Sequence, residues 1–188
     1  LGTHYLDITG EVLWVSRMIE RYEAQARRSG AILIPFSGFD SVPSDLGAWK
    51  VAEKAAKPVT RVVCLMSGKG GINGGTYETL LDMLAMNDAD TALVRSPSLL
   101  VPESERARFD QPELREPVKV AEENLTAPPF FMEPINSRVV YRSQALRGKT
   151  PFLYQELMRI PRAASGLQSW AIVGFGRMFE KVGRTRPG

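Results

Sequence analysis

The chain has 188 residues, of which 44% are hydrophobic and 24% charged, a composition that excludes global disorder. Its longest uncharged apolar runs, 31–36 and 171–175, are far shorter than the roughly 20 residues of a membrane-spanning helix. One cysteine, Cys64, excludes an internal disulfide and, with a single histidine, a Cys/His zinc site, so we expect no bound metal. We expect a reduced, cytoplasmic setting. The start at Leu1, without a signal segment or an initiator Met, suggests a piece of a longer protein.

The positive charge is concentrated at the C-terminal end. The net charge is +3, but residues 138–188 hold ten Lys or Arg and only two Glu, which leaves the first 137 residues acidic. Such a distribution suits an anionic partner, a solvated basic face or a subunit contact. Because no nucleic-acid motif is present, we do not expect nucleic acid as the partner.

The first 66 residues alternate between strand and helix patterns. Residues 4–9 read as a short strand, and a helix is expected from Thr9 or Gly10 to about residue 28, because its apolar positions recur with a period of 3.6. The apolar run 31–36 is typical of a strand buried on both faces. A helix over 44–56 and a strand over 59–66 follow. This order predicts an α/β fold with parallel pairing and right-handed crossovers.

The pattern changes after residue 67. A glycine-rich loop at 68–75 precedes an expected helix over 76–87, and the proline-rich segment 97–134 predicts an excursion over the surface with one short helix at 103–109. A helix over 135–146, a strand over 152–158 and an amphipathic segment over 165–182 complete the chain. On the predicted strand, one face holds Phe152, Tyr154, Glu156 and Met158. We place a domain boundary near Pro58.

Carboxylates follow the first two predicted strands. Ligands bind outside the carboxyl ends of strands in open parallel sheets, so Asp7, Glu11, Asp40 and Asp45 are expected to gather on one rim. Clustered carboxylates raise each other's pKa, and one of them would then serve as a general acid or base. The structural alternative is that the aspartates cap turns and that Glu11 complements the helix dipole. Tyr5 either lines the same rim or belongs to the core.

Two stretches resemble a known family. GTHYLDITGE at 2–11 and GFDSVPSDLG at 38–47 resemble the saccharopine dehydrogenase-like oxidoreductases, in particular the branch that includes the trans-acting enoyl reductases of lipid biosynthesis. Weaker similarity is found at 74–76, 138–146 and 154–156. The resemblance implies that residues 1–57 are the C-terminal part of a Rossmann-type parallel sheet. Residues 58–188 would then be a truncated α+β domain with a mixed sheet, which shapes the substrate site and a dimer.

The resemblance implies an oxidoreductase that transfers hydride between NAD(P)H and an enoyl, imine or acyl-type substrate. The residues implied for proton handling in the cleft are Asp40, Ser41, Asp45 and Tyr5. Those implied to line the cofactor cleft are Asp7, Thr9, Gly10, Glu11, Gly38 and Phe39. No strand is followed by G-x-G-x-x-G, and the nearest string, 68–75, has Asn73 at the third glycine position. The main NAD(P)-binding loop is therefore expected to be absent, and the isolated chain inactive.

Three alternatives remain open at this point. The backbone N–H groups of Gly74, Gly75 and Thr76, with Lys69, either hold a substrate carboxylate or phosphate or form a plain helix start. The segment 170–182 is either a membrane-surface helix or a helix packed against the core or a partner subunit. The rival to an enzyme is a non-catalytic dimerisation or scaffold module of the same fold. The expected partners are a small-molecule substrate and a second copy of the chain.

Overall fold

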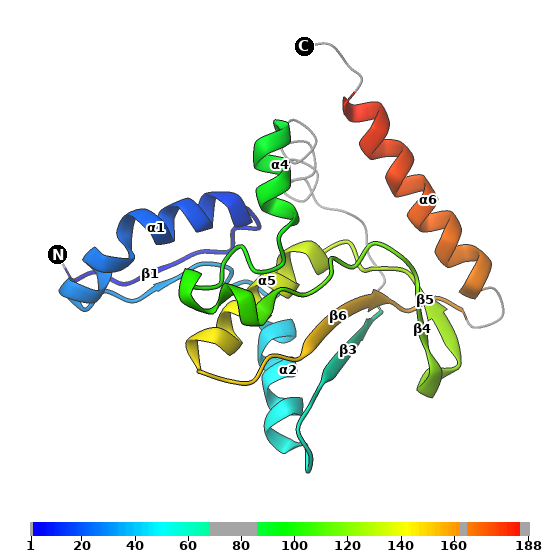
Figure 1. Cartoon of the computed structure of the whole chain (residues 1–188), viewed down its shortest axis with the longest axis horizontal. Helices are drawn as coiled ribbons and strands as arrows, with labels where there is room; N and C mark the ends of the chain where they lie inside the picture. The colour runs from blue at the N-terminus through cyan, green and yellow to red at the C-terminus, as the bar shows by residue number, and fades with distance from the viewer. Residues whose placement is uncertain (1, 68–85, 162–164, 185–188) are drawn as a thin grey trace.

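The chain opens on a β-α-β unit. The computed structural model describes residues 2–67, 86–161 and 165–184. Strand β1 (Tyr5–Leu6) pairs in parallel with β2 (Leu33–Ile34), and helix α1 (Val12–Ser29) connects them (Figure 1). The helix ends at Gly30, whose φ of 69° is the left-handed conformation that glycine adopts without strain. The predicted parallel pairing is therefore confirmed.

Helix α1 begins later than predicted. The N–H of Thr9 donates to Asp7 Oδ1 over 3.0 Å, and the N–H of Glu11 donates to Thr9 Oγ1 over 3.2 Å. These side-chain turns hold the chain after β1 in a non-helical conformation. The helix therefore starts at Val12 rather than at residue 9 or 10.

The second sheet is parallel, with one antiparallel bridge at its edge. Helix α2 (Val42–Lys54) leads to β3 (Arg61–Met66), which pairs in parallel with β6 (Leu153–Met158). On the other edge of β6, Pro129 forms an antiparallel bridge with Leu157. Helices α2 and α5 (Glu133–Leu146) contact each other, and each contacts a strand of this sheet. The mixed α/β class is confirmed.

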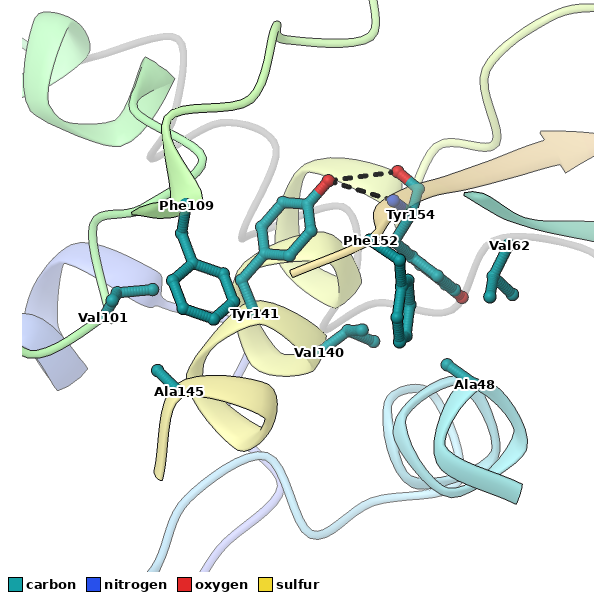
Figure 2. Close-up of a cluster of buried hydrophobic side chains, with 9 residues drawn as sticks. All are labelled: Ala48, Val62, Val101, Phe109, Val140, Tyr141, Ala145, Phe152 and Tyr154. Carbon is teal, nitrogen blue, oxygen red and sulfur yellow. Dashed lines mark hydrogen bonds between the residues drawn. The ribbon is translucent and has the colours of Figure 1, made fainter. Parts of the chain in front are cut away.

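The main core lies between α2, α5 and the sheet (Figure 2). The hydroxyl of Tyr141 donates to the carbonyl of Tyr154 over 3.3 Å and accepts from its N–H over 3.1 Å, which satisfies the backbone of β6 at its N-terminal half. Phe109 packs beside Tyr141 with ring centroids 6.2 Å apart. The buried members of this cluster are Ala48, Val62, Val101, Phe109, Val140, Tyr141, Ala145, Phe152 and Tyr154.

The segment 97–134 is not the surface excursion that its prolines predict. The 3₁₀-helix η1 (Glu103–Phe109) lies where a short helix was predicted, but Phe109 and the run 99–101 are buried. Strands β4 (Val118–Val120) and β5 (Leu125–Ala127) form an antiparallel hairpin through η2 (Ala121–Glu123). This hairpin buries Leu157 of β6. Prolines stop long elements, but the short apolar segments between them still pack.

Two helices complete the described part. Helix α4 (Asp88–Arg95) was not predicted; its N-cap is Asn87, whose side chain accepts from the N–H of Asp90 over 2.8 Å. Helix α6 (Ser165–Arg184) projects away from the body of the molecule (Figure 1), and its first turns are tied to β5 through Ser165 and Ser169. No helix in the described ranges has the length and apolar character to cross a membrane. The expected helix at 76–87 lies largely outside the described residues.

The β1–β2 sheet is more exposed than predicted. The run 31–36 was expected to be buried on both faces, yet Ile32, Leu33 and Ile34 are all exposed, Ile32 to 54%. Among the described residues this sheet has two strands, so each strand keeps an edge without a partner. Strands at the centre of a larger parallel sheet carry such apolar runs. Burial therefore depends on neighbours that the described residues do not supply.

Candidate active-site rim and its buried support

Asp7 joins the carboxyl ends of β1 and β2. Its carbonyl accepts from the N–H of Ser37 over 2.8 Å and from the Ser37 hydroxyl over 2.6 Å, and its Oδ1 accepts from the N–H of Phe36 at 3.4 Å. Phe36 has a φ of 57°, a conformation that is costly for a bulky residue. Asp7 therefore stabilises a strained turn at the rim. Its predicted cofactor contact stays a prediction.

The remaining rim residues are small or exposed. A Cβ at Gly38 would lie 2.4 Å from Asp40 Oδ1 and 3.2 Å from Ile8, so glycine permits a close approach there. Phe39 is 92% exposed at the tip of the loop, and the carboxylate of Asp40 is also exposed. This arrangement leaves Phe39 and Asp40 accessible to a ligand that approaches the rim.

The four predicted carboxylates do not line one site. Asp7 lines a cavity of about 640 Å³ between α1 and the β1–β2 sheet, and Glu11 lines one of about 290 Å³ beside α4. Asp45 lines a third, of about 390 Å³, and its Oδ2 accepts from Ser143 of α5 over 2.9 Å. Burial raises the pKa of Asp45, while Ser143 and Arg147 oppose the rise. Asp45 therefore faces α5, where its partner Ser143 lies two turns beyond Asn136, the partner of Ser41.

Tyr5 was predicted to lie either on the rim or in the core. It is exposed and therefore does not belong to the core. It lines the same cavity as Asp7, and its interaction with the Asp7 side chain raises the pKa of its phenol. Thr9 and Gly10 lie in the turn between β1 and α1, and Gly10 borders the cavity beside α4. The proposed chemistry of these residues stays a prediction.

A buried polar network holds the rim loop (residues 37–41) from its buried side. Glu156 of β6 has no exposed surface; its Oε1 accepts from Ser44 over 2.6 Å and from Tyr154 over 3.1 Å, and its Oε2 accepts from Asn136 over 2.8 Å. The amide of Asn136 also donates to the carbonyl of Asp40 over 2.9 Å and accepts from Ser41 over 2.8 Å. These bonds pair every carboxylate oxygen, which a buried charge requires. Ser41, which was predicted to handle a proton, is one of the supports of the loop.

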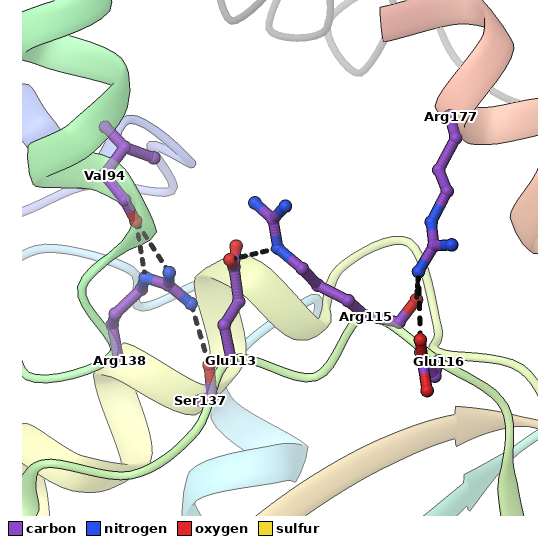
Figure 3. Close-up of polar contacts among 7 residues, drawn as sticks. All are labelled: Val94, Glu113, Arg115, Glu116, Ser137, Arg138 and Arg177. Carbon is purple, nitrogen blue, oxygen red and sulfur yellow. Dashed lines mark hydrogen bonds and ion pairs between the residues drawn. The ribbon is translucent and has the colours of Figure 1, made fainter.

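A second network joins α4 to α5 (Figure 3). The guanidinium of Arg138 is buried and donates to the carbonyl of Val94 over 2.6 and 3.2 Å and to Ser137 Oγ over 3.1 Å. Glu133 lies one turn earlier on α5; burial raises its pKa to about 7, against the opposing charge of Arg138. Its Oε2 has no hydrogen-bond partner among the described residues. This carboxyl group is thus poised to be protonated near neutral pH.

The described residues contain no complete cradle for a dinucleotide. The helix that follows β1 begins behind the carboxylate of Glu11, which repels a pyrophosphate at that helix start. In the ranges that the structure covers, no group of three His, Cys, Asp or Glu side chains is arranged to hold a metal ion. Gly74, Gly75 and Thr76, the predicted anion site, lie outside the described residues, as does Lys69.

The fold and the site define an α/β protein with a candidate ligand rim at the carboxyl ends of parallel strands. No family model matches the chain, and no solved structure matches it. A protein named as a trans-acting enoyl reductase from Mycobacterium tuberculosis is 38% identical over 159 residues, which cover 77% of this chain and 38% of that protein. The trans-acting enoyl reductase of Mycobacterium ulcerans is 31% identical over 193 aligned positions, which cover 92% of this chain and 46% of that protein.

These identities make the chain a homologue of proteins named trans-acting enoyl reductase, as the sequence resemblance implied. A third relative of the same name, from Mycobacterium bovis, is 30% identical over the same span. The chain spans less than half the length of these relatives.

Proposed function

We propose that the whole protein is an enoyl reductase of the saccharopine dehydrogenase-like type, which transfers hydride between NAD(P)H and an enoyl substrate. Among the enoyl, imine and acyl-type substrates implied by the sequence, the names of the relatives support the enoyl class. In the reaction, hydride adds to one carbon of the double bond and a proton adds to the other. This chain would contribute the closing strands of the Rossmann-type sheet and the domain that follows it.

The observation that carries this proposal is the exposed β1–β2 sheet, which has two strands among the described residues. All four residues of the two strands are exposed among the described residues, whereas parallel sheets are normally covered on both faces. Beside it lies the cavity of about 640 Å³, walled by apolar side chains of α1 such as Met18 and Ile19. Both features support a larger parallel sheet in the whole protein, whose other strands would carry the NAD(P)-binding loop.

Asp40 is our candidate for handling the proton. Its carboxylate is exposed at the rim, while its carbonyl is fixed by Asn136 over 2.9 Å, so the loop is held but the acid is accessible. Ser41 and Asp45 are engaged by Asn136 and Ser143 and are better suited to positioning. Phe39, beside Asp40, would contact the apolar part of an enoyl substrate.

The test uses the full-length protein, with NAD(P)H oxidation in the presence of an enoyl thioester as the readout. We expect Asp40→Asn to lower turnover, because asparagine cannot exchange the proton. The thermal unfolding midpoint should not change, because the side chain is exposed and asparagine is isosteric with aspartate. Asp110→Asn, at another exposed aspartate, is the matched control. Unchanged turnover in Asp40→Asn would remove Asp40 from the mechanism. Absence of any enoyl-dependent oxidation in the native protein would overturn the proposed activity.

A second candidate function is a non-catalytic dimerisation or scaffold module of the same fold. It is favoured by α6, where Leu167 is 82% exposed and Trp170 and Phe175 are also exposed. In that case the native protein would be a dimer without NAD(P)H turnover, and Leu167→Glu would yield monomers in light scattering after size exclusion. An active protein that stays monomeric would exclude this candidate. Binding to anionic liposomes would instead support the membrane-surface alternative for α6.

A further inference from the structure

The third cavity lies between α2, α5 and the segments that enter β3 and β6. Its volume is about 390 Å³, which is within the range of small-molecule sites. None of Tyr5, Asp7, Gly38 and Asp40 contributes to its wall, so it is distinct from the rim. Much of the wall is apolar, with Ala52, Val59, Val140 and Phe152 among the lining residues.

One buried donor in this wall has no acceptor. Gln144 is only 6% exposed, and its Oε1 accepts from the N–H of Phe152 over 3.2 Å. Its Nε2 is buried without a hydrogen-bond partner among the described residues. If the side-chain amide of Gln144 were flipped, its NH₂ group would face the N–H of Phe152, and two donors would oppose each other. The hydrogen bond to Phe152 therefore fixes the orientation of the amide. An unpaired buried donor is costly, and a ligand oxygen in the cavity would satisfy it.

The rest of the wall defines what kind of ligand fits. The guanidinium of Arg147 lies over the Trp49 ring, 4.1 Å from its centroid, and places a cation on the wall of the cavity. Asp45 is already bonded to Ser143, and Glu53 and Lys149 complete the charged groups of the lining. An apolar chain that ends in an oxygen acceptor matches this combination of surfaces.

We propose that this cavity is a binding site for a small acyl compound, whose carbonyl or carboxylate oxygen accepts a hydrogen bond from Gln144 Nε2 while its chain packs on Ala52, Val140 and Phe152. The site does not depend on the proposed enoyl reductase activity. It stands on the unpaired amide and on the shape and chemistry of the wall.

The test titrates the full-length protein with hexanoate, hexanamide and hexylamine, three probes of equal chain length. The side-chain amide of Gln144 and the indole N–H of Trp49, followed by NMR, report on the site itself. We expect hexanoate and hexanamide to bind and to shift both signals, whereas hexylamine, which offers no acyl oxygen, does not. Stronger binding of hexanoate, lost in Arg147→Gln, would identify the ligand as a carboxylate; equal binding would identify a neutral carbonyl.

Gln144→Glu keeps an oxygen for the N–H of Phe152 but replaces the donor with an acceptor. We expect it to weaken binding of the acyl probes at least about tenfold. Lys50→Gln is the matched control, because Lys50 also lies over the Trp49 ring, at 4.5 Å, but does not line the cavity. Ala52→Leu, which fills the cavity without touching the amide, should abolish binding as well. No shift with millimolar hexanoate or hexanamide, or equal binding by hexylamine, would overturn the proposal.

Discussion

Ser44 donates a hydrogen bond of 2.6 Å to Glu156, a residue 112 positions later in the chain. The first turn of α2 is thereby fixed to the middle of β6. Asn136 of α5 bonds to the same carboxylate and to the carbonyl of Asp40. Asn136 thus connects the buried carboxylate of Glu156 to the backbone of the exposed Asp40.

We expect Ser44→Ala to destabilise the protein by about 1–3 kcal/mol, because it leaves a fully buried carboxylate oxygen with one donor fewer. The free energy of unfolding from urea denaturation measures the effect. Ser104→Ala, at an exposed position of η1, should change it by less than about 0.5 kcal/mol. Equal stability of the two variants would mean that the Ser44 bond contributes nothing net.

Much of the fold was predictable because its signals are local. The 3.6-residue period of α1, and the apolar strands before and after it, gave the β-α-β unit, and α5, β6 and α6 lie close to their predicted ranges. The hairpin of β4 and β5 was not predicted, since three-residue strands between prolines carry too little periodicity. Its burial depends on Leu157, which is distant in sequence.

The site was predictable only in part. Gly38, Phe39 and Asp40 do lie at a rim that follows parallel strands, but the partners of Ser41 and Ser44 are 92 to 112 positions away and no local pattern names them. One signal was present: the predicted face of β6 put Glu156 between Tyr154 and Met158 on an apolar side. Phe152, Tyr154 and Glu156 are indeed buried, whereas Met158 is half-buried. A carboxylate on a buried face requires donors.

The second network predicts a pH dependence. Burial raises the pKa of Glu133 from 4.5 to about 7, so the folded state holds this proton more tightly than the unfolded state. The resulting stabilisation is present below pH 4.5 and is lost as the pH rises through about 7, by roughly 3 kcal/mol in total. Arg138 opposes the rise in pKa, and the charges of Glu156 and Glu113 support it.

Glu133→Gln should remove this pH dependence, because the amide does not titrate. Unfolding free energies of both proteins, measured from pH 4.5 to 8, should diverge with rising pH, with the native protein losing stability relative to the variant. Parallel curves would show that Glu133 titrates equally in the folded and unfolded states.

Tyr141→Phe tests the support of β6. The hydroxyl pairs both the N–H and the carbonyl of Tyr154, and its loss leaves two buried backbone groups without a partner. We expect a loss of about 1–3 kcal/mol in urea denaturation and faster hydrogen exchange at the N–H of Tyr154. Tyr22→Phe, at an exposed tyrosine of α1, is the control and should be nearly neutral. If exchange at Tyr154 is unchanged, the hydroxyl does not protect that strand.

Substitutions of two glycines test the shape of the rim and the stability of α2 independently. In Gly38→Ala the new Cβ would lie 2.4 Å from Asp40 Oδ1 and 3.2 Å from Ile8, so the Asp40 side chain has to move. In Gly47→Ala the Cβ meets nothing within 4 Å on an exposed turn of α2, and alanine favours the helix by about 0.5–1 kcal/mol. We expect Gly38→Ala to lower enoyl-dependent turnover of the full-length protein and Gly47→Ala to raise its unfolding midpoint with turnover unchanged. If Gly38→Ala retains full turnover while its structure shows a displaced Asp40, the position of that carboxylate does not govern the reaction, and proton transfer has to be assigned to another group at the rim.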